Sequence, residues 1–541
     1  MRPVCACFVL LALLTTLSLA APLARGQKEA RELWQIRAQN ITNDLLKDAT
    51  DLSSMQRAVL WGKLGQRWWR EDPRRARTWI TNAIEVVEQV PNKETSEERE
   101  ERFQTAGVLL AIVTPLDQKL TKRLATLLTG EDKSAANERG GDGDALIWAA
   151  VSVVGEDPKR AAELGAMALR TGTVSQIAQL LFPLRELDPK LADSLFVQAL
   201  VLVKQNPNTM LANSLMHAAF PAQQGHNASL PVPPDPLRVE LLQTYLPLLN
   251  VNPANGADPN SCGAVHWLAP LYHEFERLLP QQMPILRQAF NRCQSYDPVN
   301  QQRINDYTHG QPQNTVESLL KAASDAKDKN VRWDYEYRAA NVAQEGKDYE
   351  LALRILDDMS KEQRGDWWNS ARWDWAADGA IEHYQKRRFR EMNLMLDAVP
   401  SDLQPLAKAA FIDRLPERAV SETAPIIQIL NDATRGLRRS SIPAREKWPW
   451  NFALLKLTVK YQFADANGVL KDAIAALNQV DYPTPVNLFE TFRNVGAPLL
   501  EMDEFVVKDA LASVTIVPMR AQLRLSLLDA TLQRMRNAPQ N

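Results

Sequence analysis

The feature that most constrains the fold is a hexapeptide, Glu-Asp-Pro-basic-basic-Ala, which occurs at residues 71–76 and again at 156–161. A shortened form, Asp-Pro-Lys-Leu-Ala, follows at 188–192. The Asp is a favoured N-cap, because its carboxylate accepts hydrogen bonds from the free N–H groups of a first helical turn. Pro is tolerated next, since its missing N–H had no partner within the helix. The small Ala lets a neighbouring helix approach closely. The motif therefore predicts repeated helix starts in a stack of helices.

Composition and periodicity extend this prediction to the whole chain. The 541 residues are too many for one ordinary core, and 45% hydrophobic with 24% charged residues is typical of folded proteins. Apolar residues recur with the helical period of 3.6 from Gln27 onward, without sustained period-2 alternation. Only 21 Gly are present, which also favours helix. We expect an all-α protein.

The spacing of the helix starts indicates how these helices are arranged. Pro158 and Pro189 are 31 residues apart, about one helix-turn-helix unit. We predict an α-solenoid, a superhelical stack of antiparallel helix pairs whose repeats are degenerate. Two helical lobes, 27–221 and 315–541, flank a Pro-rich joint with broken helices over 222–314. In the second lobe we expect one helix over 450–479 and a last helix, 518–536, that caps the array.

One segment of the second lobe resembles a known repeat. Residues 346–353, Gly-Lys-Asp-Tyr-Glu-Leu-Ala-Leu, are similar to the opening of the second helix of a tetratricopeptide repeat, and 337–343 would supply its first helix. The resemblance implies a helix-pair superhelix that binds protein segments or carries other domains. The chain as a whole resembles exported bacterial helical-repeat proteins of unknown function.

The N-terminus has the features of a secretory signal peptide over residues 1–20. Arg2 provides the positive charge, an apolar stretch spans 8–17, and Ser18-Leu19-Ala20 is a small-x-small cleavage site. The apolar stretch is shorter than the roughly 20 residues that a membrane span needs. We expect export to the periplasm or the outside of the cell, without a transmembrane segment after signal cleavage.

Two cysteines remain after the predicted cleavage, Cys262 and Cys293. An even pair in an oxidising compartment favours a disulfide. A continuous helix would hold the two far apart, whereas the intervening prolines, at 270, 280 and 284, allow a broken hairpin that brings them together. Both a disulfide and two free thiols are compatible with the sequence.

The most unusual local feature is a clustering of aromatic residues: five of the 14 Trp lie within 332–337 and 367–375. Trp and Tyr at helical spacing beside an Arg form a surface that can stack on a sugar ring or anchor a peptide. The candidate binding residues are Trp333, Tyr337, Trp367, Trp368, Arg372, Trp373, Asp374 and Trp375. The alternative, which we favour, is that these side chains fill space between helices, as we expect of the tryptophans in the first lobe.

Other chemistry has little support in the sequence. His266, His273 and Glu276 share a helical face only if Pro270 does not interrupt it, and His273-Glu274 lacks the second His of a zincin helix, so we expect no metal. P-loop, Gly-x-Gly-x-x-Gly and Gly-x-Ser-x-Gly motifs are absent, and we expect no cofactor. A formal net charge of −2 gives no electrostatic basis for nucleic-acid binding.

The sequence therefore favours an exported helical-repeat binding or scaffold protein that engages a protein or peptide partner in the cell envelope. The alternative is a secreted (α/α) toroid enzyme acting on polysaccharide. Its acid and base would come from four carboxylates near the tryptophans: Asp366, Asp374, Asp378 and Glu382. A purely structural envelope protein is a third possibility. The oligomeric state is not indicated.

Overall fold

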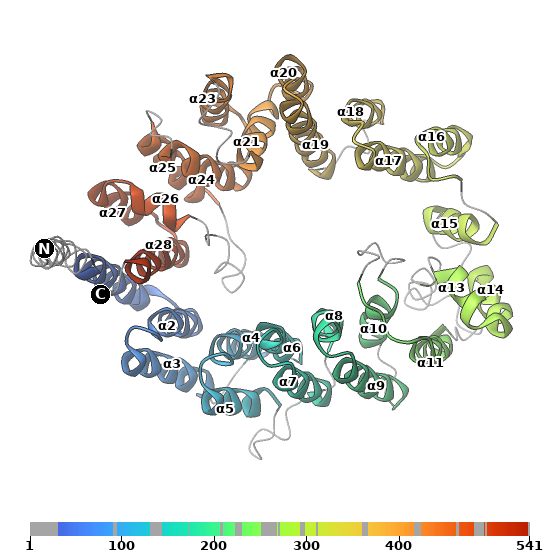
Figure 1. Ribbon diagram of the computed structural model, residues 1–541, viewed down its shortest axis with the longest axis horizontal. Helices are drawn as coiled ribbons and strands as arrows, with labels where there is room; N and C mark the ends of the chain where they lie inside the picture. Colours follow the sequence, from blue (N-terminus) through green and yellow to red (C-terminus); the bar gives the residue numbers. More distant parts are fainter. Residues whose placement is uncertain are drawn as a thin grey trace, which may run out of the picture. The chain divides into compact units, whose positions relative to one another are not determined.

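The computed structural model describes residues 31–89, 95–129, 143–171, 174–205, 209–221, 230–249, 268, 271–292, 298–309, 312–359, 366–415, 424–460, 465–480, 492 and 495–538. Within these ranges the regular secondary structure is helical, and none of them contains a strand (Figure 1). The predicted all-α fold class is confirmed. The predicted signal peptide over 1–20 lies outside the described residues.

The Asp-Pro motifs begin helices as predicted. Asp72, Asp157 and Asp188 each accept a hydrogen bond from the main-chain N–H of the third residue after them, at 3.1, 3.0 and 3.1 Å. The Ala of each motif has no exposed surface: Ala76, Ala161 and Ala192. Gly65, which faces the helix of the first motif, shows the close approach that a small residue permits. A Cβ added to Gly65 would lie 2.8 Å from the carbonyl oxygen of Ala76 in the next helix.

The chain forms two compact units, Ile84–Ala407 and a second unit made of Met1–Ala83 together with Lys408–Asn541. The boundaries of these units differ from those of the predicted lobes and joint, and the division into two lobes and a joint stays a prediction. The elements of the unit Ile84–Ala407 are α4 (Ser96–Val113), α5 (Gln118–Thr129), α6 (Gly143–Val153), α7 (Pro158–Thr171), α8 (Ile177–Leu187), α9 (Pro189–Gln205), α10 (Thr209–Ala219), α11 (Asp235–Tyr245), η3 (Leu246–Leu249), α13 (Tyr272–Leu278), η6 (Pro280–Gln282), α14 (Met283–Arg292), α15 (Pro298–His309), α16 (Val316–Asp325), α17 (Lys329–Glu345), α18 (Tyr349–Asp358), α19 (Asp366–Gln385) and α20 (Phe389–Asp397).

Helices in this unit pack on their neighbours along the chain. The closest pairs are α6 with α7, α16 with α17, α17 with α18, and α19 with α20. Side-chain hydrogen bonds join residues one repeat apart: Arg160 donates to Thr121 at 2.9 Å, and Arg238 donates to Glu274 at 3.1 Å. Because each helix pair buries its apolar face against the pairs before and after it, the fold is an α-solenoid.

The last part of this unit contains an internal repeat of 40 residues. Residues 332–335 (Arg-Trp-Asp-Tyr) on α17 correspond to 372–375 (Arg-Trp-Asp-Trp) on α19. Lys347 and Arg387, also 40 apart, both have positive φ, 62° and 58°. After each of them, the next N–H donates to a carbonyl five residues earlier at 2.9 Å, which is the hydrogen bonding of a left-handed helix end. The pairs α17–α18 and α19–α20 are therefore two copies of one unit.

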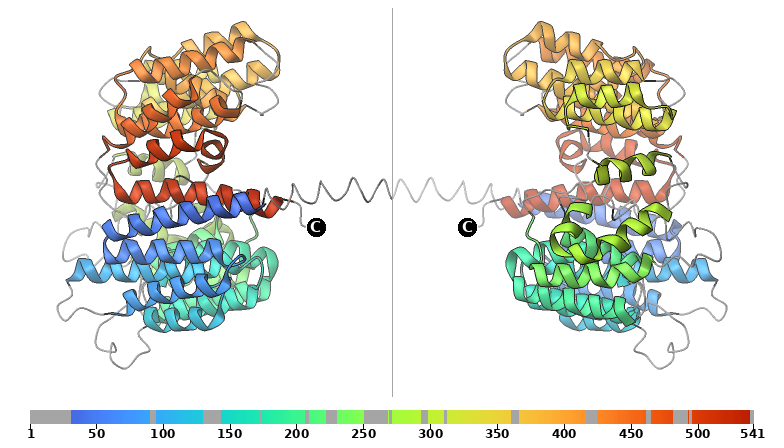
Figure 2. Two further views of the ribbon diagram at one scale, coloured as in Figure 1. Left: turned by 90° about the vertical axis from the view of Figure 1, so that its left-hand side faces the viewer. Right: turned by 90° about the vertical axis from the view of Figure 1, so that its right-hand side faces the viewer.

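The unit Met1–Ala83 with Lys408–Asn541 joins the two ends of the described chain. Its elements are a helix over 31–48, η1 (Ala49–Asp51), α2 (Ser54–Trp68), the beginning of α3 (Pro73–Glu88), the end of α21 (Gln404–Arg414), α23 (Ala424–Arg439), α24 (Ala444–Lys460), α25 (Ala466–Leu477), α26 (Gly496–Glu501), α27 (Glu504–Ala512) and α28 (Val517–Asn537). The helix over 31–48 and α2 lie beside α28 (Figures 1 and 2).

The sequence predicts that the last helix caps the array, whereas the structure packs this helix, α28, against the first described helices. Arg520 and Arg524 on α28 both bind the buried Asp48 at the end of the first described helix. Arg67 of α2 donates to Asp529 of α28 at 2.6 Å. Arg520 and Arg524 are thus ion-paired to a helix more than 460 residues earlier in the chain.

The predicted single helix over 450–479 is also wrong, because the structure has two helices there, α24 and α25. Asp465 is the N-cap of α25 and accepts a hydrogen bond from the N–H of Gly468 at 3.1 Å. This cap starts a new helix that packs back on α24. Among the described residues, no helix is long and apolar enough to cross a membrane.

Candidate functional site

The sequence-predicted binding residues lie on two helices of the unit Ile84–Ala407. Trp333 and Tyr337 belong to α17, and α19 carries the others. The described side chains divide into a buried and a half-buried group. Trp368, Arg372 and Trp375 are buried, with 5%, 7% and 8% of their surface exposed. The side chain of Trp367 lies outside the described part of the structure.

Two of the buried residues hold the start of α19 against the end of α18. The indole N–H of Trp368 donates to the carbonyl oxygen of Leu356 at 2.7 Å. The guanidinium of Arg372 lies 4.4 Å from the centre of the Trp368 ring, and its Nη2 is 2.5 Å from Asp357. A stacked, charge-paired guanidinium in this position supports packing. Trp368 and Arg372 therefore contribute to the packing of α19 on α18.

The half-buried group has a different geometry. Trp333 and Tyr337 stack on each other with ring centres 5.7 Å apart and ring planes at 6°, as residues four apart on a helix can. Trp373 and Asp374 are half-buried as well. Since Trp333 and Trp373 occupy equivalent positions of the 40-residue repeat, two consecutive repeats each present part of an indole at the same register.

Two carboxyl groups on α17 and α19 have shifted pKa values. Burial raises the pKa of the Glu336 carboxyl, Arg332 partly opposes that shift, and Asp358 adds to it. The pKa of Glu382, one of the carboxylates of the enzyme alternative, is lowered mainly by a hydrogen bond from Lys386. A lowered pKa keeps a carboxyl ionised at neutral pH, whereas a general acid needs a raised one.

The other three carboxylates of the enzyme alternative are Asp366, Asp374 and Asp378. Asp374 and Asp378 are half-buried on α19, and the side chain of Asp366 lies outside the described part of the structure. The enzyme alternative stays a prediction.

The predicted disulfide and the histidines considered as metal ligands are only partly within the described residues. Cys262, Cys293 and His266 lie outside the described residues, and the disulfide stays a prediction. His273 is exposed, with Nδ1 at 3.8 Å from Glu276. Among the described residues, no three His, Cys, Asp or Glu side chains are grouped as metal ligands would be.

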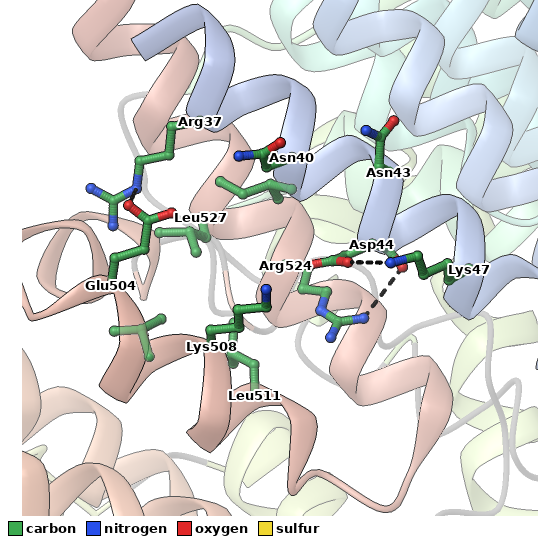
Figure 3. A pocket seen from close by; sticks show the side chains of 12 residues that line it. Arg37, Asn40, Asn43, Asp44, Lys47, Glu504, Lys508, Leu511, Arg524 and Leu527 are labelled. Atoms are coloured by element: carbon green, nitrogen blue, oxygen red, sulfur yellow. Dashed lines mark hydrogen bonds and ion pairs between the residues drawn. The ribbon is translucent and has the colours of Figure 1, made fainter. Parts of the chain in front are cut away.

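Sequence reasoning missed a cavity in the unit that joins the chain ends. It lies between the helix over 31–48, α27 and α28, and its volume is about 300 Å³ (Figure 3). Its charged lining residues are Arg37, Asp44, Lys47, Glu504, Lys508 and Arg524. Because two stretches more than 450 residues apart form it, no local motif signals it.

The helices and their neighbour-to-neighbour packing define an all-α helical-repeat protein. In comparisons with known proteins, neither a family model nor a curated protein matches the chain. A solved structure described as a "Circular tandem repeat protein with novel repeat topology and enhanced subunit contact surfaces" aligns over 90% of this chain and 96% of its own, with 13% identity and a TM-score of 0.15. So low a score supports no argument. The predicted resemblance to exported bacterial proteins has no support from these comparisons.

Proposed function

We propose that the protein is an exported helical-repeat scaffold that binds a protein or peptide partner in the cell envelope. The observation that carries the proposal is the equivalent placement of Trp333 and Trp373, half-buried on consecutive repeats. Stacked repeats offer extended binding surfaces, and Trp and Tyr are the residues that most often carry binding energy at protein interfaces.

A chain-like partner suits this surface better than a single small ring. Helix α18 packs on both α17 and α19, and neighbouring helix axes lie about 8–10 Å apart, so the indoles on α17 and α19 are separate contact points. A peptide with two apolar side chains can reach both. The stacking of Tyr337 on Trp333 restricts the rotamers of both rings before binding, which lowers the entropic cost of ordering them.

The test is affinity purification from the native envelope fraction with the full mature chain. The double variant Trp333→Ala, Trp373→Ala should lose the partner, because each anchor contributes at least about tenfold in affinity. Trp148→Ala is the matched control, since Trp148 on α6 is 51% exposed and belongs to the same compact unit. A partner enriched equally by all three proteins, or by none, would contradict the proposal.

Export requires a separate measurement. Cleavage after Ala20 predicts an envelope protein whose first residue is Ala21. N-terminal sequencing of the protein purified from its native cells tests this part alone. A chain that keeps its first 20 residues would remove export from the proposal and leave the binding surface untouched.

A further inference from the structure

The cavity at the chain ends combines an apolar floor with charged walls. Its aliphatic lining residues are all at most 9% exposed: Ile41, Val507, Leu511 and Leu527. Its volume of about 300 Å³ lies at the lower end of the range for small-molecule sites. The cavity is therefore large enough for a small organic molecule with an apolar part.

Arg37 is the first of two cations in the wall that have capacity for a ligand. Its Nη1 is 3.5 Å from the carbonyl oxygen of Leu500, and its Nε is 3.7 Å from Glu504. Both contacts are long, and Nη2 is buried without a hydrogen-bond acceptor among the residues that the structure describes. A guanidinium has five donors, and a buried donor left unsatisfied usually indicates a missing partner.

Lys508 is the second. It lies one helical turn after Glu504 on α27 and forms neither an ion pair nor a hydrogen bond with any described residue. In Figure 3 its side chain extends toward the space between α28 and the helix over 31–48. The other two cations of the wall are occupied, because Lys47 is paired with Asp44 at 3.2 Å and Arg524 binds Asp48.

We propose that this cavity binds an organic carboxylate with a short apolar body. The carboxylate would accept hydrogen bonds from Arg37 and Lys508, and the apolar body would cover the aliphatic floor. A carboxylate matches the planar fork of a guanidinium. Inorganic phosphate fits less well, because the floor would face its remaining oxygens without donors. Glu504 competes for Arg37, so the ligand displaces the Glu504 carboxylate when it binds.

Calorimetric titration of the full chain with octanoate, 1-octanol and inorganic phosphate tests the ligand class. We expect octanoate to bind at least about tenfold more tightly than either of the others, since a charge-assisted hydrogen bond contributes that much. Octanol binding as tightly as octanoate would show that the cations are not involved. Tighter binding of phosphate than of octanoate, or absence of octanoate binding, would also overturn the proposal.

Three variants test the location. Lys508→Gln should weaken octanoate binding about tenfold, and Glu504→Gln should strengthen it because the competing carboxylate is gone. Lys471→Gln, an exposed lysine of α25 outside the cavity, is the control and should leave affinity unchanged. Opposite effects of two substitutions one turn apart cannot arise from general destabilisation. Equal affinities of Lys508→Gln, Glu504→Gln and wild type would place the ligand elsewhere and refute the site.

Discussion

Asp48 holds the ion cluster that joins the two ends of the described chain. Its side chain is 4% exposed; Oδ1 accepts from Arg520 Nε at 2.8 Å and Oδ2 from Arg524 Nη1 at 2.5 Å. The side chains of Arg520 and Arg524 are largely buried as well, with 17% and 13% of their surface exposed. The substitution Asp48→Asn keeps the size of the side chain and removes its charge, which leaves two cations facing a neutral amide.

The structure sets the size of the expected loss. Breaking a buried ion pair by removing one partner costs about 3–5 kcal/mol. Arg520 keeps a hydrogen bond to the carbonyl oxygen of Val514 at 2.9 Å, and Arg524 keeps one to the carbonyl oxygen of Asp44 at 3.3 Å. These remaining acceptors reduce the penalty. We therefore expect Asp48→Asn to lower the free energy of unfolding by about 3 kcal/mol, the lower end of that range.

Hydrogen exchange measured by mass spectrometry is the suitable assay, because repeat arrays need not unfold in one step. Asp48→Asn should reduce protection in the helix over 31–48, α2 and α28, and leave α17 unchanged. Asp51→Asn is the control: Asp51 is 64% exposed and 4.0 Å from Arg520, and exposed pairs contribute about 0–1 kcal/mol. A loss below about 1 kcal/mol for Asp48→Asn, or an equal loss of protection along the whole chain, would refute the reasoning.

Three further substitutions have defined outcomes. Gly496→Ala should destabilise the protein by about 1–3 kcal/mol or prevent folding, because the new Cβ would lie 1.9 Å from the Ser526 carbonyl oxygen. Gly155→Ala is the control and should be nearly neutral, since its new Cβ meets nothing within 4 Å. Equal melting temperatures of the two variants would contradict this prediction. Glu336→Gln should raise the melting temperature at pH 7, because the raised pKa of the folded state makes the ionised carboxyl unfavourable at pH values above its ordinary pKa of 4.5. The difference in melting temperature between the variant and the wild type should disappear below pH 4.5. A difference that does not change with pH would exclude titration of Glu336 as its cause. Trp368→Phe should cost about 1–3 kcal/mol in urea unfolding, since it leaves a buried main-chain carbonyl without its donor, and an unchanged midpoint would show that the hydrogen bond contributes nothing.

Local signals account for the parts of the fold that the sequence predicts well. An Asp followed by Pro determines a helix start within four residues, which is why Asp72 and Asp157 cap helices in the structure. The same logic explains the failure over 450–479. The apolar period continues through that region, and Asp465 acts as a cap without a following Pro. An Asp without a following Pro is a weaker signal for a helix start, because Asp is also common inside helices.

The candidate site shows why a motif does not determine burial. Arg332 and Arg372 have the same position in the 40-residue repeat, yet the first is exposed and the second is buried. Arg372 has Trp368 one turn before it and Asp357 across from it, whereas the position equivalent to Trp368 is the N-cap Asp328. The neighbours in space decide which copy becomes part of the core. The sequence alone therefore does not distinguish the buried arginine from the exposed one.

The contacts of the terminal helices explain the largest error of the sequence interpretation. In an open array, the last helix needs a polar outer face, and the arginines of α28 fit that expectation. The structure instead packs α28 against α2, and Asp48 neutralises Arg520 and Arg524. Charged residues on the final helix of a repeat protein thus have two physical meanings, a solvated end or a buried pairing with the first helices. A complementary acidic residue that is buried near the other end of the chain distinguishes them.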